Sequence, residues 1–528
     1  MMLSIVTFLI FTVGVFVFTW YKARNVNMQS SEGYFLGGRS LPGIVIACSL
    51  VLTNLSTEQM VGLNGQSYMS SMTVMAWEVT APLSLIFLAF LFLPKYLKSG
   101  ITTIPDFLQQ RFDLSTRQLM SILFLIGYAS SFLPTVLYSG ALVLDQIFNV
   151  SETLQLSEFW TIFLIALAIG GIGCFYIIYG GLRAISFADT IYGIGLILGG
   201  ILIPFLGLYH LGDGSLSVGT DRLLHTNTDK LNAIGGPGSN VPWPTILTGL
   251  LFNNLFYWCT NQAIVQRSLG AKSLAEGQKG VLFAGFFKVF GVLYLVIPGL
   301  IAYDLYGGNI PNGDQAYPQL VIDVLPTALS GFFAAVLFGA IMSSFNGALN
   351  SCITLFTLDL YKPIFKPNAS DDQIVKAGRI FAFSFAFLSI IITPFVLFAG
   401  DGLYNYLQEM FGFINIPILG AIVIGFFTKY VPAIAPKIAT ITHLILYGAS
   451  KVVLGDLNFL YVLAILFPLN IALQLIIAQF RSRETPYEMQ DSGAVDMTPW
   501  KHRKLTTALI LIMVIGLYVF FSPLGVAT

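Results

Sequence analysis

The sequence predicts an all-α polytopic membrane protein, and three observations support this fold class. Of the 528 residues, 56% are hydrophobic and only 10% are charged, whereas a soluble chain is about a quarter charged. Apolar runs recur along the whole chain, and each is long enough to cross a hydrocarbon core of roughly 30 Å. Two of these runs are interrupted by polar clusters at residues 53–59 and 253–262. Polar groups at membrane depth are tolerated only where they face a protein-lined cavity.

The apolar runs predict about fourteen transmembrane helices. The first lacks a basic leader and a small-residue cleavage site, so we expect a retained helix and not a signal peptide. The expected spans are 2–20, 43–70, 73–94, 118–148, 158–178, 186–210, 244–263, 280–304, 327–360, 376–399, 403–427, 437–454, 457–480 and 505–525.

The distribution of basic residues predicts the orientation. If both termini lie outside, 22 of the 26 Lys and Arg residues fall in inner loops. Three (Arg222, Lys230 and Lys451) fall outside, and Lys288 lies within a span. This asymmetry is a strong positive-inside signal.

The polar interruptions lie in the second and seventh spans, five spans apart. Paired broken helices are typical of transporters built from inverted repeats, whose binding site lies at the breaks. We therefore expect two five-helix repeats of opposite topology, at 43–210 and 244–428. The remaining segments are a first helix with its inner loop (1–42), an extracellular loop (211–243) and three peripheral helices (429–528). Within the inner loops, we expect an interfacial helix at 101–112 and a flexible segment at 481–500.

Ionisable side chains inside the spans mark a function or an internal ion pair. The candidates are Glu58, Glu78, Asp189 and Lys288. One interpretation is that Lys288 only ties helices together by pairing with a carboxylate. The other is that these groups hydrogen-bond a neutral polyhydroxylated solute, because amides and carboxylates offer the donors and acceptors that hydroxyls need. The amide candidates are Asn54, Gln59, Asn254 and Gln408.

Anionic solutes are disfavoured because, apart from Arg379 at the inner end of the tenth span, the expected spans contain no arginine, the side chain best suited to a carboxylate. Aromatic residues at or near the interruptions (Trp77, Tyr257 and Trp258) can pack against the apolar face of a sugar ring. With 14% aromatic residues in the chain, most others are expected in the core or facing lipid.

Two adjacent serines, Ser343 and Ser344, interrupt the apolar ninth span. Such hydroxyls usually bond back to a carbonyl one turn earlier. Alternatively, they join carbonyls freed by the first break as oxygen ligands for a hard cation such as sodium.

Other function classes lack support in the sequence. There is no phosphate-binding loop, no basic tail for nucleic acid, and no nucleophile–base pair or metal cluster. All four cysteines fall in expected spans. We therefore expect no enzyme, and a solute channel remains an alternative to a transporter.

At these residues the chain resembles the sodium:solute symporter family, and in particular its bacterial sodium/glucose (galactose) cotransporter-like branch. The resemblance runs from about residue 30 to 430. The matching stretches are YFLGGRSLP (34–42), NLSTEQ (54–59), GITTIPDF (100–107), YGGL (179–182), QRSLGAK (266–272), QKG (278–280), AIMSS (340–344) and YLQE (406–409).

The resemblance implies a LeuT-like core and sodium-driven sugar import across a bacterial inner membrane, with no obligate protein partner. Tyr257 would gate the site from the inner side, and Asp189 would lie on the inner ion pathway. The implied sugar contacts include Asn54, Gln59, Glu78, Asn254, Lys288 and Gln408. The implied sodium ligands are the carbonyls of Leu52, Leu55 and Ala340 and the hydroxyls of Ser343 and Ser344.

The chain departs from the family pattern at four positions, which lie in the third and ninth spans. Trp77 replaces a tyrosine, and Ala81 replaces a serine that contacts galactose, so galactose itself is disfavoured while a hexose-like solute is not. Asn346 and Gly347 stand where members with a second sodium site have serines, which favours one sodium. Polyols, sugar acids and proton coupling remain alternatives.

Overall fold

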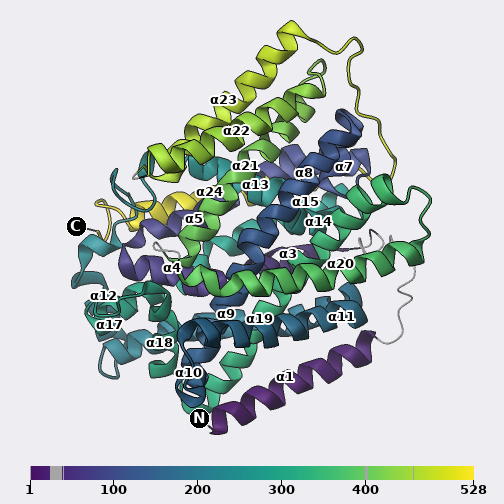
Figure 1. Ribbon diagram of the computed structural model, residues 1–528. Helices are drawn as coiled ribbons and strands as arrows, with labels where there is room; N and C mark the ends of the chain where they lie inside the picture. Colours follow the sequence, from purple (N-terminus) through teal and green to yellow (C-terminus); the bar gives the residue numbers. More distant parts are fainter. Residues whose placement is uncertain (1, 24–38, 40, 399–401, 456, 528) are drawn as a thin grey trace.

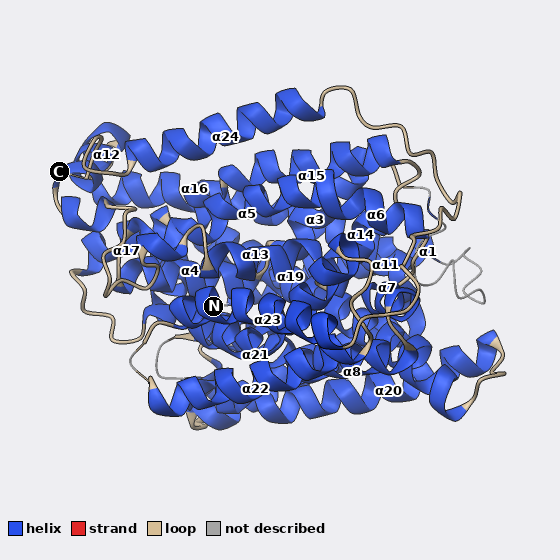
Figure 2. Ribbon diagram, turned by 90° about the horizontal axis from the view of Figure 1, so that it is seen from above, coloured by secondary structure: helices blue, strands red, loops and turns tan. Residues whose placement is uncertain are grey.

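The computed structural model describes residues 2–23, 39, 41–398, 402–455 and 457–527, apart from the side chains of residues 2, 19, 20, 22, 23, 178–190 and 328. Over these residues the protein is helical, with isolated bridges but no β-strand (Figure 2). Nine helices in this part are long and apolar enough to span a membrane, or up to eleven if each bent pair counts as one span.

Helices occupy all the expected spans of the first half. The second span is broken as predicted, and its two parts are bent by 58°. The helices are α1 (Met2–Ala23), α3 (Gly43–Asn54), α4 (Thr57–Met69), α5 (Ala76–Phe87), α6 (Leu93–Ser99), α7 (Ile104–Arg111), α8 (Leu114–Gly127), α9 (Leu133–Phe148) and α10 (Val150–Leu154).

The fifth and sixth spans form one helical element, α11 (Glu158–Leu211), without the non-helical loop expected between them. Gly173 packs against Phe345, and Gly199 packs against Phe333. In a straight helix, Gly173 and Gly199 would lie about 39 Å apart along the axis. Their contacts Phe345 and Phe333 lie on one other helix, Thr327–Thr354, and are only about 18 Å apart along it. The element therefore bends back between the two glycines, as two spans would.

The second half contains the other expected break and one that the sequence did not predict. Its helices are α12 (Leu216–His225), α13 (Gly249–Cys259), α14 (Gln262–Leu269), α15 (Leu274–Val289), α16 (Gly291–Leu295), α17 (Ile297–Tyr306), α18 (Ala316–Val324), α19 (Thr327–Thr354), α20 (Asp371–Ile392), α21 (Leu403–Phe427), α22 (Ile434–Val453), α23 (Phe459–Phe480) and α24 (Arg503–Phe520). The eighth span is bent by 50° between α15 and the α16–α17 segment.

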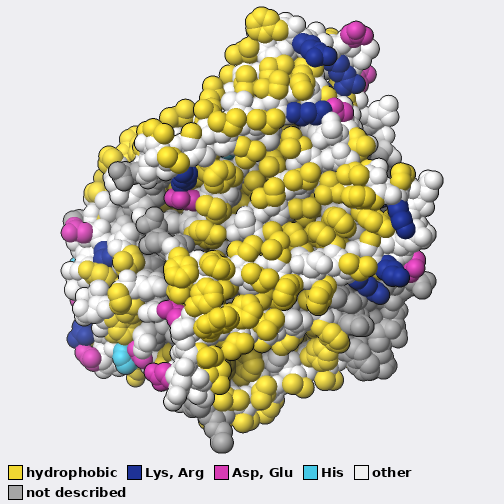
Figure 3. Space-filling view, viewed as in Figure 1, with side chains coloured by type: hydrophobic (Ala, Val, Ile, Leu, Met, Phe, Trp, Pro, Cys, Tyr) yellow, Lys and Arg dark blue, Asp and Glu magenta, His cyan; other side chains and the backbone are white. Residues whose placement is uncertain are grey.

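The helices run roughly along one direction, and α1 lies at the edge of the bundle beside α11 and α19 (Figure 1). On the face in Figure 3, hydrophobic side chains cover the middle, and most charged ones lie toward the two ends of the helices. This pattern is expected of a surface that faces lipid between two polar boundaries.

Two expectations for the inner loops were wrong. The helix α7 forms, but Phe107, Leu108 and Arg111 are fully buried, so it is not an interfacial helix. Residues 481–500 are not a free loop: Ser492 N–H donates to the carbonyl of Lys98 at 2.8 Å. Further along, Leu274 N–H donates to the Asp496 carbonyl (2.9 Å), and Trp500 N–H donates to the Gln278 side chain (2.9 Å).

Candidate solute and sodium sites

The break in the second span frees backbone carbonyls inside the protein. Leu55 and Ser56 have extended backbone, with φ/ψ of −75/102° and −139/173°. The carbonyls just before the break therefore lose the partners that a continuous helix would supply. The hydroxyl of Thr57, at the start of α4, donates to the Leu337 carbonyl at 3.2 Å, which ties the break to α19.

The break in the seventh span is stabilised by polar partners from other helices. The Asn261 side chain caps α14 by accepting from Ala263 N–H (3.0 Å), and it also accepts from the Tyr128 hydroxyl (2.7 Å). The Tyr96 hydroxyl donates to the Cys259 carbonyl at 2.8 Å. These bonds satisfy groups that the interruption would otherwise leave unpaired in a low-dielectric interior.

A small cavity lies between the two breaks. The side chains narrow it to about 30 Å³, which is room for about one water molecule. Eight of the nine predicted solute-contacting residues line it: Asn54, Gln59, Trp77, Glu78, Asn254, Tyr257, Trp258 and Gln408. The rest of the lining is Glu58, Ala81, Phe132, Asn253, Tyr404, Leu407 and Phe411.

The ninth predicted residue, Lys288, does not line this cavity but reaches its wall. Its ammonium group forms an ion pair with Glu78 and donates to the Asn54 side chain. Asn54 in turn donates to the Tyr257 hydroxyl at 3.1 Å. Lys288 and Glu78 are 3% and 2% exposed, so neither charge has bulk water as an alternative partner. The buried pair therefore connects α15 and α5 to both broken spans.

A row of amides forms another part of the wall. Asn253 donates to the Gln408 carbonyl oxygen at 2.8 Å and accepts from Asn415 at 2.7 Å. Asn254 donates to the Thr80 hydroxyl at 2.9 Å. Asn415 was not predicted from the sequence, where its one signal is its isolation in an apolar span.

Several polar atoms in the lining have no protein partner. Glu58 Oε2, Gln59 Oε1 and Trp77 Nε1 are buried and make no hydrogen bond within the described residues. Leaving such an atom unpaired costs about 1–3 kcal/mol, so a group of them requires an explanation. Hydrogen bonds to a bound solute or to ordered water provide one.

The two tryptophans of the lining are held in place by aromatic contacts. Trp77 stacks on Phe459, with ring centroids 6.3 Å apart and planes 12° apart, and contacts the Tyr404 ring edge-on. Trp258 lies edge-on to Tyr257 at 5.3 Å. Each ring therefore has a fixed orientation in the cavity wall.

The serine pair has the features expected of ion ligands. Ser343 and Ser344 are 6% and 2% exposed, and neither hydroxyl has a hydrogen-bond partner in the described structure. By contrast, Ser351 on the same helix donates back to the Gly347 carbonyl at 3.1 Å. The expected back-bonding is thus absent where sodium ligation was predicted.

The surroundings of the serine pair also fit sodium. Its helix, α19, contacts α3, whose end supplies the freed carbonyls of Leu52 and Leu55. A set of neutral oxygens suits a hard cation, and the described residues contain no group of His, Cys, Asp and Glu that could hold a metal ion. Asp189, the predicted ion-pathway residue, lies in α11, but its side chain is outside the described part of the chain.

Known proteins resemble this chain over most of its length. A model of the sodium:solute symporter family matches residues 34–434. The uncharacterized symporter YidK of Escherichia coli (strain K12) is 48% identical over 99% of this chain and 92% of its own. A sodium/glucose cotransporter of Vibrio parahaemolyticus is 32% identical over 81% of this chain and 80% of its own.

A solved structure also has the same fold. It is the substrate-bound outward-open state of a Na⁺-coupled sialic acid symporter, and it matches 92% of this chain and 99% of its own with a TM-score of 0.77. At 20% sequence identity, this similarity concerns the fold and not the solute.

Proposed function

Because the chain belongs to the sodium:solute symporter family, we propose that it imports a neutral, hexose-like polyhydroxylated solute together with sodium by alternating access. Membership makes the chain a multi-pass membrane transporter and not an enzyme, with sodium as its coupling ion. The sugar, the residues that bind it and the bacterial inner membrane as its location are part of the proposal.

The main observation that supports the proposal is the lining of the cavity between the two breaks. It combines amides, carboxylates and tryptophan rings, and three of its buried polar atoms have no partner in the described structure. Amides and carboxylates can bond hydroxyls, and the ring faces suit the apolar side of a sugar. The lining contains no arginine, which favours a neutral solute over a sugar acid.

The cavity must widen to admit a solute, which agrees with alternating access. Sodium would bind first, held by the carbonyls of Leu52, Leu55 and Ala340 and the hydroxyls of Ser343 and Ser344, and would stabilise the outward-open arrangement. The solute would then close the outer side, and Tyr257 would have to move before it leaves inward. Asp189 would lie on the inner ion pathway.

One sodium is enough to drive accumulation. A single charge gains about 2.3 kcal/mol per 100 mV, and a tenfold gradient adds about 1.4 kcal/mol. Together these would concentrate a neutral solute several hundredfold. Asn346 and Gly347, which replace the serines of a second site, support a single ion.

The decisive experiment is uptake of radiolabelled solutes by proteoliposomes under an imposed sodium gradient. Hexoses, polyols and sugar acids are compared, and galactose is expected to be a poor substrate because of Trp77 and Ala81. A solute that rises above its external level only with sodium supports the proposal. Accumulation driven by a proton gradient alone would contradict it, as would simple equilibration, which indicates a channel.

Alanine substitutions test the sodium ligands. We expect Ser343→Ala and Ser344→Ala each to raise the sodium concentration for half-maximal uptake about tenfold, because each removes one oxygen ligand worth roughly 1–2 kcal/mol. Their thermal stability without sodium should change little, since the hydroxyls have no protein partner. Ser351→Ala, which removes a bonded hydroxyl on the same helix, is the matched control and should leave sodium dependence unchanged.

A further inference from the structure

The bend in the eighth span has the solute site on one side and an apolar cavity on the other. Lys288 and Gly291 flank the bend on the site side. A Cβ on Gly291 would lie 2.7 Å from Glu78 Oε2, so α16 approaches that carboxylate as closely as its backbone allows. Phe290 and Leu293, from the same bend, line the apolar cavity instead.

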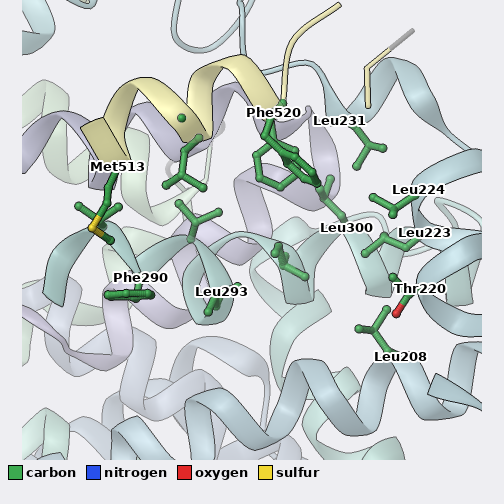
Figure 4. A pocket seen from close by; sticks show the side chains of 16 residues that line it. Leu208, Thr220, Leu223, Leu224, Leu231, Phe290, Leu293, Leu300, Met513 and Phe520 are labelled. Carbon is green, nitrogen blue, oxygen red and sulfur yellow. The ribbon is translucent and has the colours of Figure 1, made fainter. Parts of the chain in front are cut away.

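This second cavity, called the α24 cavity below, has a volume of about 550 Å³. That is within the range of about 300–1,000 Å³ typical of ligand pockets. In Figure 4, Met513 and Phe520 on α24 face Phe290 and Leu293 across it. Residues of α11, α12 and α17 complete the wall, among them Leu208, Leu223 and Leu300.

The lining determines what can bind in the α24 cavity. It contains no charged side chain, and its one hydroxyl, that of Thr220, already donates to the Leu216 carbonyl at 2.8 Å. A sugar would find no polar partner here for its hydroxyls. The occupant must therefore be apolar.

The helices around the α24 cavity indicate where an apolar occupant would come from. The cavity borders α24, only 17% of whose membrane-spanning window is buried. On the outer face of this helix, Ile512 and Ile515 are 67% and 62% exposed. Because that face is expected to lie against acyl chains, the hydrocarbon of the bilayer is the nearest source of an apolar occupant.

We infer that the α24 cavity binds an acyl chain of a membrane phospholipid and that this chain controls the bend at Phe290. A chain packed on Phe290 and Leu293 holds α16 against α5, where Gly291 meets the carboxylate of Glu78. The occupant thereby acts on the Glu78–Lys288 pair in the wall of the solute site. The effect on transport rests on the proposed function, but the binding of lipid does not.

The test fills the cavity with a side chain. Gly516 lines it, and a Cβ there would meet no heavy atom within 4 Å, so Gly516→Phe adds a bulky side chain at the cavity wall with no clash at its Cβ. Gly14 on α1 has equally open surroundings, and Gly14→Phe is the matched control. Each protein is reconstituted with dioleoylphosphatidylcholine, extracted in mild detergent and examined by native mass spectrometry.

We expect wild type and Gly14→Phe to retain a bound phospholipid that Gly516→Phe loses. Equal retention by both variants would overturn the proposed site, as would a co-purifying polypeptide in place of lipid. Sodium-driven uptake is the second measurement, and its maximal rate should fall about fivefold in Gly516→Phe, at the lower end of typical coupling between sites. Loss of lipid with unchanged uptake would overturn control of the bend. If wild type transports no solute, the proposed function is wrong, but the mass spectra still show whether the α24 cavity binds lipid.

Discussion

At the residue scale, the Lys288–Glu78 pair is the strongest constraint on the solute site. Removing one member of a buried pair leaves an uncompensated charge and costs about 3–5 kcal/mol. We therefore expect Lys288→Met to lower the thermal unfolding temperature markedly and to abolish uptake. Replacing both charges, as in Lys288→Met with Glu78→Leu, should recover most of the stability, because two apolar side chains leave no unpaired charge.

The double variant also separates the two interpretations of Lys288. If the pair contacts the solute, the double variant is stable but inactive in sodium-driven uptake. Near-normal uptake would show that the pair only ties α15 to α5. Unfolding temperature and uptake are measured on the same preparations, so that a folding defect is not mistaken for loss of binding.

The sequence predicted the positions of some residues of the site but not of others. Asn54 and Tyr257 belong to polar clusters within apolar runs, and the structure brings these clusters to one cavity as predicted. Asn415 was missed because a single amide in an apolar helix has no local pattern. The pairing of Lys288 with Glu78 in particular depends on the packing of α15 against α5, which sequence alone does not specify.

At the element scale, the sequence predicted the breaks that polar residues cause but not the one that packing causes. Residues 289–301 contain no polar cluster, and Gly291 at the bend and the nearby Pro298 are their local signals of an irregular helix. Its visible cause is a tertiary contact, the approach of Gly291 to Glu78. Likewise, residues 481–500 are polar, but distant backbone groups such as that of Lys98 hold them in place.

The junction between α4, η7 (Gly313–Gln315) and α21 provides a pH-dependent test. Asp314 is 6% exposed, and its carboxylate accepts from Leu403 N–H at 3.1 Å. Burial raises the pKa of Asp314 from 3.8 to about 6. Between these values the folded protein holds a proton that the unfolded chain lacks, so this group makes stability rise as the pH falls from 7 toward 4.

We therefore expect Asp314→Asn to be more stable than wild type at pH 7, because it buries no charge and its amide oxygen can still accept from Leu403. The difference should shrink toward pH 4, where the wild-type carboxyl is protonated. Thermal unfolding of both proteins across this pH range is the measurement. The exposed Asp229→Asn variant is the control, and a constant offset between Asp314→Asn and wild type would contradict the assignment.

At the scale of the whole molecule, the predicted fold class is confirmed: the described residues are all-α, and the fold has a LeuT-like inverted-repeat core with broken second and seventh spans. The number of fourteen spans remains a prediction, since nine to eleven are long and apolar enough in the described part of the chain. The fold class could be predicted because the backbone must satisfy its own hydrogen bonds in hydrocarbon, which permits only helices or closed barrels. The boundaries of the predicted repeats remain a prediction, and so does the orientation.

The orientation can be tested by labelling single cysteines from each side of the membrane. The positive-inside distribution places residues 481–500 inside and 211–243 outside, with both termini outside. Ser217 and Ser492 are both exposed, and each is replaced by cysteine in a background lacking the four native cysteines. In right-side-out vesicles, a membrane-impermeant maleimide should label Ser217→Cys and spare Ser492→Cys until detergent is added. Labelling in the opposite order would invert the topology and place the α24 cavity, which borders α12, toward the inner leaflet.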